Sequence, residues 1–403
     1  MRAELIRRLP KTDLHVHLDG SLRLSTLIEL ASERGVTLPS NTEDGLLELV
    51  FRERYGSLQE YLEGFQYSVA VLADGEALER AAFELAEDCQ AEGVRYLEVR
   101  FAPQLHVRAG FEMDAVVAAV DRGLRRAAER YNERPEVKSG AEPPFVAGII
   151  LCALRYFTAD FSVGFRRFFD AFPDAPPTKI FALASEGVAR AAARLRREGL
   201  CVVGIDLAGR EGGFPAEHHE VAYQVAHEAF LGKTVHAGED YGPESIFQAI
   251  GDLHADRIGH GTFLFDATKI RDESIEDREG YIDRLAEFVA DKRITVEVCL
   301  TSNQQTIPEL ADDLSKHAFG EMRKRQLSTT FCTDNRLVSR TTISREIGRA
   351  TEAFGLGARE VRNMLIYGFK RSFYPGTYLE KRNYVRSVID YTDRILAEEG
   401  TGA

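Results

Sequence analysis

Strand-like and helix-like segments alternate along the whole chain. Eight short runs are strand-like, and several of them are almost continuously apolar and rich in Val and Ile, which is typical of strands that are covered on both faces. Turn residues and stretches with apolar residues at helical spacing separate these runs. The predicted strands are Asp13–Leu18, Val94–Ala102, Phe145–Leu154, Cys201–Leu207, Lys233–Ala237, Arg257–His260, Ile294–Leu300 and Ser328–Thr333.

Most of the gaps between these strands contain a predicted amphipathic helix. Strand and helix alternate eight times without an internal linker, which is the pattern of a closed (β/α)8 (TIM) barrel formed by one domain over residues 1–403. A doubly wound open sheet is the alternative, but the count of eight and the placement of the polar residues favour the barrel. The clearest helical segments are Glu76–Gly93, Gly187–Gly199, Glu217–Gly232 and Tyr281–Lys292.

Three segments lie outside the simple repeat. Leu38–Phe65 follows the first predicted strand and carries an apolar stripe, so it is either a helix packed on the core or a lid over a pocket. Tyr131–Pro144 is polar and contains three prolines, which is typical of a flexible surface excursion. From Glu360 past Glu380 the pattern is helical again. We therefore expect extra helices after strand one and at the C-terminus, where they close the barrel.

Composition and charge narrow the class of protein. The chain has 403 residues, of which 44% are hydrophobic, and it can bury a large core. Its net charge of −13 argues against nucleic acid or an anionic membrane as the main partner. Residues 1–8 lack the apolar run of a signal peptide, no segment could cross a membrane, and the five cysteines are not in metal-binding or disulfide patterns. We expect a cytoplasmic protein with buried, reduced thiols.

Two histidines in the first predicted strand suggest a metal site. In a strand, side chains two residues apart point the same way, so His15 and His17 project together beside Asp19. Imidazole is a common ligand of zinc and related metals. A single His-X-His is weak evidence, because two histidines can also lie hydrogen-bonded in a polar core.

The other polar residues at strand ends strengthen this interpretation. The active site of a TIM barrel lies at the carboxyl ends of its strands. Four of the ten histidines are predicted there, which is more than scattered core histidines would give. A zinc site built from three of them and one aspartate, with a position left for water, matches catalytic zinc, although one of the four could instead support the others from outside. These predicted ligands are His15, His17, His236 and Asp334, and the fourth histidine is His260.

Several blocks of sequence together resemble the adenosine deaminase family of the metal-dependent amidohydrolase superfamily. They occur in the order of the family between residues 14 and 334, and six such blocks in sequence are far more specific than any one of them. The chain departs from the family where Leu300 replaces a proline and where Asn335 replaces an aspartate. The blocks are Leu14–Gly20, Val203–Gly209, Thr234–Glu239, Arg257–Gly261, Thr301–Asn303 and Thr333–Asp334.

The resemblance implies a zinc-dependent hydrolysis that removes the 6-amino group of adenosine or 2′-deoxyadenosine in purine salvage, with one zinc ion per chain. Glu239 would donate a proton to purine N1, and His260 would hydrogen-bond the attacking water. The alternatives are that Glu239 caps the following helix and that His260 bonds the backbone at the rim.

The same resemblance implies a small purine nucleoside as substrate. Its expected contacts are His17 beside the reacting group, Asp19 at a ribose hydroxyl, the Gly209 N–H at N3 and Asn335 at N7. N7 only accepts hydrogen bonds, and an asparagine amide donates without taking up a proton. Asp19 before Gly20 is also ordinary turn chemistry.

The remaining polar residues receive structural interpretations. Glu98 and Arg100 are predicted to form a structural ion pair or a rim contact, and Ser302 is expected to support the metal site from outside. The histidines outside the predicted site are expected on helices or loops without a catalytic role. They are His106, His218, His219, His227, His254 and His317.

Rival functions differ in recognisable residues. A relative acting on adenine typically carries aspartate where Gly259 stands, so Gly259 favours a nucleoside, while a modified adenosine stays open. Amide or ester hydrolases often bridge two metals with a lysine at the end of strand four, and Asp206–Gly209 contains none. A catalytically silent binding protein would be expected to lack Glu239. The oligomeric state is not indicated by the sequence.

Overall fold

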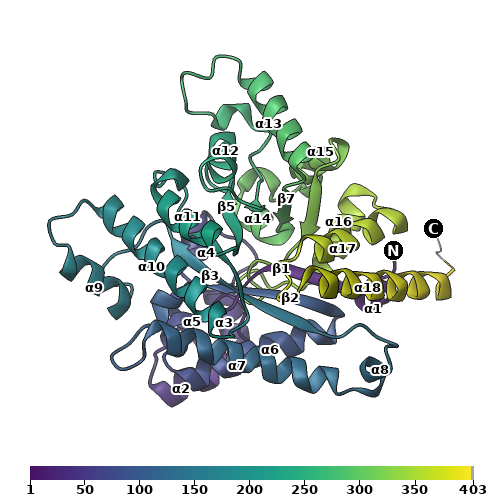
Figure 1. Cartoon of the computed structure of the whole chain (residues 1–403), viewed down its shortest axis with the longest axis horizontal. Coiled ribbons are helices and arrows are strands. Elements are labelled where there is room, and N and C mark those ends of the chain that lie inside the picture. The colour runs from purple at the N-terminus through teal and green to yellow at the C-terminus, as the bar shows by residue number, and fades with distance from the viewer. Residues whose placement is uncertain (401–403) are drawn as a thin grey trace.

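Eight parallel strands form the centre of the protein, in the order in which they occur along the chain. The computed structural model describes residues 1–400, and Figure 1 shows the strands surrounded by helices. Each strand pairs with the next, and most strand residues are buried because the helices cover the outer face. The strands are β1 (Lys11–His17), β2 (Val94–Phe101), β3 (Val146–Leu154), β4 (Val202–Ala208), β5 (Gly232–Ala237), β6 (Arg257–His260), β7 (Thr295–Val298) and β8 (Ser328–Phe331).

The sheet closes on itself where the chain leaving β8 meets the end of β1. The Asp334 N–H donates to the carbonyl oxygen of His15 and the His17 N–H donates to that of Asp334, each at 2.7 Å. The Thr333 hydroxyl adds a bond to the Asp13 carboxylate across the same seam, at 2.5 Å. The closed order of eight parallel strands confirms the predicted (β/α)8 barrel and makes the open-sheet alternative wrong.

The helices lie outside the strands and include each of the four predicted above. α6, α10, α11 and α13 contain most of those predicted segments. The bounds are α1 (Ala3–Arg8), α2 (Leu24–Arg34), α3 (Glu43–Leu49), α4 (Leu58–Leu62), α5 (Phe65–Val71), α6 (Gly75–Ala91), α7 (Met113–Asn132), α8 (Pro135–Lys138), α9 (Val163–Ala171), α10 (Pro177–Arg197), α11 (Glu220–Glu228), α12 (Pro243–Gly251), α13 (Arg278–Lys292), α14 (Leu300–Thr306), α15 (Phe319–Lys324), α16 (Ile343–Phe354), α17 (Ala358–Arg371) and α18 (Tyr378–Glu398).

Local signals explain where these helices begin and end. The Asp74 side chain accepts the Ala77 N–H and so caps the start of α6, whose buried face includes Leu78 and Leu85. Gly93, with φ +94°, then turns the chain into β2. A Cβ at this position would lie 2.5 Å from the carbonyl oxygen of Arg7, so only glycine fits there.

Most predicted strand boundaries are shifted by one or two residues, and two regions show the reason for a difference. Strand seven ends at Val298 and not at Leu300, because Leu300 begins α14 and turns the following polar residues inward. Tyr131–Pro144 is not a wholly irregular excursion: it contains the end of α7 and the short helix α8, which Pro135 begins. The proline that predicted a loop therefore starts a helix.

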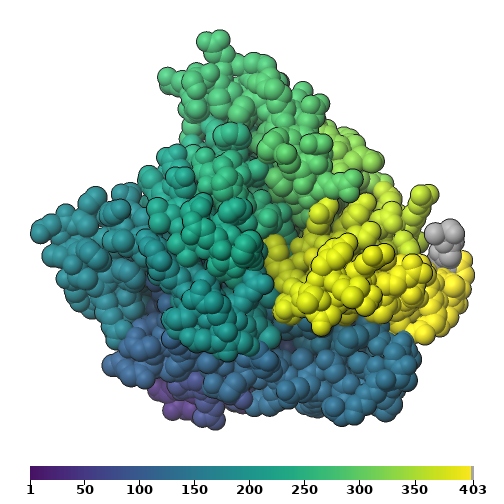
Figure 2. All heavy atoms as spheres, viewed as in Figure 1, coloured from purple at the N-terminus to yellow at the C-terminus, as the bar shows by residue number. Residues whose placement is uncertain are grey.

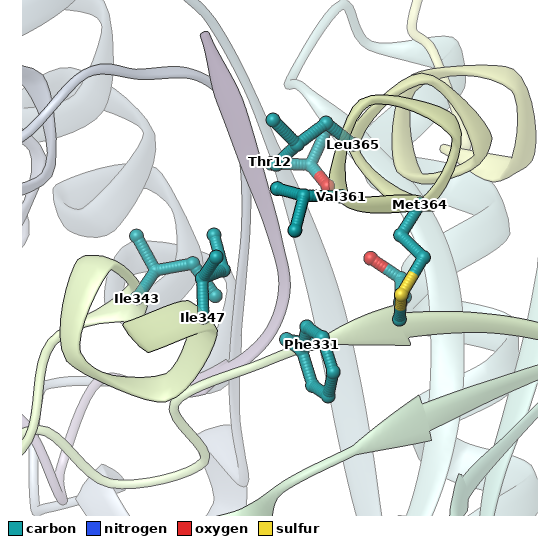
Figure 3. Close-up of a pocket in the computed structure, with 8 residues that line it drawn as sticks. Thr12, Phe331, Ile343, Ile347, Val361, Met364 and Leu365 are labelled. Carbon is teal, nitrogen blue, oxygen red and sulfur yellow. The ribbon is translucent and has the colours of Figure 1, made fainter. Parts of the chain in front are cut away.

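The C-terminal helices complete the barrel, as predicted. α16 and α17 cover the outer side of the β8–β1 seam and leave an apolar cavity of about 10 Å³ between them (Figure 3). α18 returns to α1, where Arg8 forms ion pairs of 2.8 Å with Glu398 and Glu399. In Figure 2 this yellow segment lies against the blue part of the chain and covers one side of the molecule. Among residues 1–400, no helix has both the length and the apolar content needed to span a membrane.

Candidate metal centre and active site

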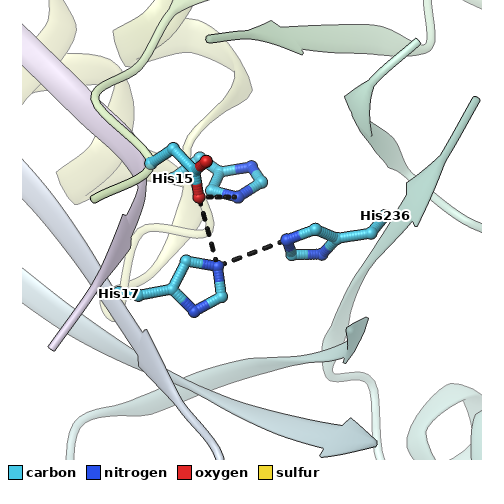
Figure 4. A group of neighbouring side chains, drawn as sticks. His15, His17 and His236 are labelled. Carbon is cyan, nitrogen blue, oxygen red and sulfur yellow. Dashed lines mark hydrogen bonds and ion pairs between the residues drawn. The ribbon is translucent and has the colours of Figure 1, made fainter. Parts of the chain in front are cut away.

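Three histidines and one aspartate meet at the carboxyl ends of β1, β5 and β8. Figure 4 shows the rings of His15, His17 and His236 converging on one point. The His17 Nε2 lies 3.2 Å from the His236 Nε2, and the Asp334 Oδ1 lies 3.4 Å from the His15 Nε2 and 3.5 Å from the His17 Nε2. The structure therefore brings the four predicted ligands together as one potential metal-binding group.

The spacing of these atoms fits a transition-metal ion. Ligands about 2.0–2.1 Å from one tetrahedral zinc ion lie about 3.3 Å from each other, close to the three separations above. The buried His15 Nε2 also has no hydrogen-bond partner among the described residues. A buried imidazole nitrogen without a partner is costly unless a ligand or ion occupies its lone pair. The donor set thus fits one divalent transition metal.

Two buried carboxylates orient the imidazoles. The His15 Nδ1–H donates to the Glu297 Oε2 at 2.9 Å, and the His236 Nδ1–H donates to the Asp206 Oδ2 at 3.0 Å. With Nδ1 engaged in this way, the Nε2 lone pair of each ring faces the metal position. The sequence indicated the ligands but did not reveal these partners, because Glu297 and Asp206 look like ordinary strand residues.

Arg100 links these two carboxylates inside the barrel. Its guanidinium donates to Asp206 at 3.1 Å and to Glu297 at 2.8 Å. The predicted Glu98–Arg100 ion pair is wrong, since Glu98 instead pairs with Arg257. The Glu98 and Arg100 side chains both point inward, but each meets a residue from another strand and not its neighbour on β2. Alternation along one strand cannot reveal that choice.

The charge of this buried network favours a cation. The carboxylates of Glu98, Asp206 and Glu297 pair with two guanidinium groups, those of Arg100 and Arg257, and the Asp334 carboxylate lies beside the imidazole rings. Burial would raise the pKa of Glu297, but Arg100 and Arg257 hold that pKa well below its usual range. The carboxylate therefore stays ionised. A divalent cation would balance the excess of two negative charges.

Asp334 and His260 both adopt left-handed backbone conformations, with φ +60° and +66°. This region is uncommon for residues other than glycine and often marks functional sites. The backbone bonds that close the barrel hold Asp334 in place. Gly259 makes room beside His260: a Cβ there would lie 3.0 Å from the His15 Cε1. The strained conformations thus direct both side chains into the site.

Glu239 lies next to His260, where the sequence placed it. Its Oε1 is 3.6 Å from the His260 Nε2, and 11% of its side chain is exposed. Burial raises the pKa of Glu239 well above its usual range, and the nearby carboxylates of Asp334 and Glu211 raise it further. A carboxyl in this setting can keep a proton near neutral pH and give it to a ligand.

Glu211, which the sequence interpretation overlooked, holds the turn that carries Glu239. Its carboxylate accepts four consecutive backbone N–H groups, from residues 238 to 241, at 2.7–3.0 Å. It also bonds the Ser245 hydroxyl. A capping role therefore exists at this turn, but Glu211 fills it and leaves Glu239 free to face the site. The only sequence signal for this role was that Glu211 is an acidic residue two positions after Gly209.

The predicted substrate contacts surround this centre. Gly209 directly follows β4 and has a left-handed conformation, with φ +89°. Asp19 is buried, its Oδ1 has no partner among the described residues, and burial raises its pKa to about 7. His106, predicted to be structural, is buried with its Nε2 4.0 Å from the Asp19 Oδ2. The Asp19 Oδ1 and the His106 Nε2 are therefore both available to a bound hydroxyl.

Asn335 is held by the segment that follows β1. Its Nδ2 donates to the Tyr61 hydroxyl at 2.8 Å, and this hydroxyl lies 2.7 Å from the Ser339 Oγ. The amide nitrogen carries a second hydrogen that this contact leaves free. Tyr61 is buried on α4, so the Leu38–Phe65 segment packs over the end of β8 and reaches a predicted substrate residue. Gly20 makes this possible, because a Cβ there would overlap the Asn335 side chain.

The residues after β7 take up different roles from those predicted. The Ser302 hydroxyl donates to the Cys299 carbonyl at 3.3 Å, within its own helix. The neighbouring Asn303 instead contacts the ring of His260, and the distant His317 contacts Asn303. His218, His227 and His254 are exposed, in agreement with the prediction that they lie outside the site.

Comparison with known proteins finds relatives over most of the chain. The family described as adenosine deaminase matches residues 10–391. Adenosine deaminase 1 of Streptomyces coelicolor is 37% identical over 373 residues, covering 92% of this chain and 84% of that protein. The match thus extends over nearly all of the barrel and includes every residue of the site.

Solved structures of plant deaminases share the fold. The Arabidopsis N6-mAMP deaminase is 26% identical, with a TM-score of 0.71 and coverage of 96% of this chain and 99% of the other. Arabidopsis ADAL complexed with IMP is 25% identical, with a TM-score of 0.72 and coverage of 97% and 99%. Because the sequence match extends over the whole barrel, the chain belongs to the adenosine deaminase family and is a hydrolase that acts on carbon–nitrogen bonds.

Proposed function

We propose that the protein is a zinc-dependent adenosine deaminase, which converts adenosine and 2′-deoxyadenosine to inosine and 2′-deoxyinosine with release of ammonia, in purine salvage. The observation that supports this most is the convergence of three imidazole Nε2 atoms and the Asp334 carboxylate beside Glu239 and His260. Zinc is the metal of choice because catalytic zinc sites combine nitrogen and oxygen ligands with a position for water.

His15, His17, His236 and Asp334 would hold one zinc ion per chain. When bound, zinc lowers the pKa of water to about 7 and so supplies a nucleophile at neutral pH. His260 hydrogen-bonds the oxygen that attacks C6 of the purine and stabilises charge on it. Glu239 delivers a proton to N1, which makes C6 more electrophilic.

The remaining residues orient the substrate. The Gly209 N–H donates to N3, and the free hydrogen of the Asn335 amide donates to N7. Asp19 accepts a ribose hydroxyl, and His17 lies beside the reacting amino group. Each of these residues is at the carboxyl end of a strand or in the loop that follows it, on the same face of the barrel.

Substrates other than adenosine form the second candidate. The Arabidopsis relative is named for a methylated adenosine monophosphate. In this chain, the residue proposed to bind the ribose is Asp19, and its carboxylate, when ionised, would repel a phosphate. Gly259 in place of aspartate favours a nucleoside over free adenine. Membership of the family leaves the amide or ester hydrolase alternative without support.

The test is the rate at which the 6-oxopurine product forms from adenosine, 2′-deoxyadenosine, adenine, AMP and N6-methyl-AMP, because the last of these would release methylamine and not ammonia. We expect kcat/KM to be highest for the two nucleosides. A higher value for AMP, N6-methyl-AMP or adenine would contradict the proposed substrate while leaving the reaction class intact.

We also propose a cytoplasmic location, because no cysteine forms a disulfide in the described part of the chain and four are buried.

A further inference from the structure

The ring of His260 is held from behind by a line of hydrogen bonds. Its Nδ1 lies 3.1 Å from the Asn303 Nδ2, and the Asn303 Oδ1 lies 3.1 Å from the His317 Nε2. The Phe319 N–H donates to the His317 Nδ1 at 3.0 Å. Asn303 lies on α14, and His317 and Phe319 lie at the start of α15. The side chains of His260, Asn303 and His317 are buried, with at most 2% exposed.

The backbone amide at one end sets the direction of the whole line. A backbone N–H can only donate, so the His317 Nδ1 must accept and carries no hydrogen. Burial lowers the pKa of His317 to about 4, so at neutral pH its ring is uncharged and its one hydrogen lies on Nε2. That hydrogen is donated to the Asn303 Oδ1. The Asn303 amide is thereby oriented with its nitrogen towards His260.

This orientation decides the tautomer of His260. An amide nitrogen only donates, so the His260 Nδ1 accepts and has no hydrogen of its own. The hydrogen of the neutral ring then lies on Nε2. This atom is buried, has no partner among the described residues, and lies 3.6 Å from the Glu239 Oε1. It therefore points a hydrogen-bond donor into the reaction site.

We propose that Asn303 and His317 are positioning residues that fix His260 as its Nε2–H tautomer, so that His260 gives a hydrogen bond to the attacking oxygen and does not act as a base. The statement that His260 hydrogen-bonds the attacking oxygen rests on the proposed function. His260 has no free lone pair while the line is intact, because Nε2 carries hydrogen and Nδ1 faces Asn303. Any proton lost by the attacking oxygen must therefore pass to a carboxylate of the site.

The sharpest change is Asn303→Asp, which keeps the shape of the side chain. The carboxylate can still accept from His317, but it cannot donate to His260 and instead attracts a hydrogen onto the His260 Nδ1. In serine proteases, reversing the tautomer of a catalytic histidine with the geometry intact lowers kcat by about 10⁴-fold. Here we expect kcat to fall by at least about 100-fold with a much smaller change in KM.

The decisive readout is the ¹⁵N NMR spectrum of the histidine rings in the zinc-loaded protein without substrate. The His260 signals are assigned by their loss in His260→Asn. Wild type should show hydrogen on Nε2 alone, and Asn303→Asp should show hydrogen on Nδ1. Hydrogen on Nδ1 in wild type, or a bare Nδ1 in Asn303→Asp, would overturn the proposal.

Two further variants separate this role from simple packing. His317→Gln keeps a donor for the Asn303 Oδ1 and should retain kcat within about five-fold, whereas His317→Phe removes the donor and should lower kcat much further. Equal losses in both would count against the proposal. Because the tautomer is measured without substrate, that result stands even if adenosine is not the substrate.

Asn132→Asp provides a matched control. The Asn132 side chain also makes two hydrogen bonds, to the backbone of Phe145 at 2.8 and 2.9 Å, but it lies at the end of α7. The same change of amide to carboxylate should cost stability there without altering kcat or the His260 spectrum. A comparable loss of kcat in this control would mean that the effect of Asn303→Asp is one of stability alone.

Discussion

At the scale of single residues, several groups of the site owe their orientation to partners that cannot be identified from their positions in the sequence. The His15 and His236 rings are turned by Glu297 and Asp206, and the Glu239 turn is held by Glu211. The ligands themselves could be predicted, because polar residues at the ends of predicted parallel strands meet on one face. Their partners come from opposite sides of the barrel or from loops, and only the closed structure brings them together.

Glu239 offers the first test at this scale. Glu239→Gln has nearly the same shape but cannot release a proton, so the fold and the bound metal should be retained while kcat falls by about 10²–10⁴-fold. Steady-state kinetics and metal analysis measure the two effects separately. Near-normal kcat in this variant would show that another group protonates the purine.

Asn335 provides the second test. Asn335→Ala should leave purine N7 without a donor and lower kcat/KM for adenosine, corresponding to about 1–3 kcal/mol of lost transition-state binding. It also removes the Tyr61 contact, so comparison with 7-deazaadenosine isolates the N7 interaction. Wild type should discriminate between the two substrates and the alanine variant should not. Undiminished discrimination in Asn335→Ala would exclude Asn335 as the N7 partner.

At the scale of helices and strands, the periodicity of the sequence predicted most of the barrel. Strands buried on both faces tend to be continuous apolar runs, and β3 and β4 show this pattern most clearly. The boundary at Leu300 failed because a polar segment there is helical and buried within the protein, and the one around Pro135 failed because the proline begins a short helix that has no buried residue. α14 is the clearest case, since its polar residues are buried around the site.

The packing of α17 on the β8–β1 seam can be tested through Leu365, which is 7% exposed and borders the small cavity there. Leu365→Ala should enlarge this cavity and lower the free energy of unfolding by about 2–5 kcal/mol. Leu379→Ala, at a position on α18 that is 62% exposed, is the control and should change stability by less than about 0.5 kcal/mol. Chemical denaturation measures both. Equal effects would mean that α17 does not seal the seam.

At the scale of the whole molecule, the stability of the barrel depends on pH through buried histidines away from the metal centre. Burial lowers the pKa of His219 to about 3, against about 6.5 in an unfolded chain. Between these values the unfolded chain binds a proton that the folded protein does not. The contribution of His219 to stability is therefore complete above about pH 6.5 and is lost as the pH falls towards 3.

His219→Asn should reduce this dependence. The Ser185 hydroxyl donates to the Phe181 carbonyl, so the His219 Nδ1–H donates to the Ser185 Oγ at 2.7 Å, and an asparagine amide can keep that donor. Between pH 6 and 4, the free energy of unfolding of wild type should fall more steeply than that of the variant, by up to about 1.4 kcal/mol per pH unit. Parallel curves would show that His219 takes up its proton in both states.

The central claim is that one zinc ion, held by His15, His17, His236 and Asp334, makes this barrel a deaminase. The most direct test is native mass spectrometry of the protein purified without added metal. We expect the mass of the polypeptide plus a single zinc ion per chain. A chain that carries two metal ions, or none, would contradict it.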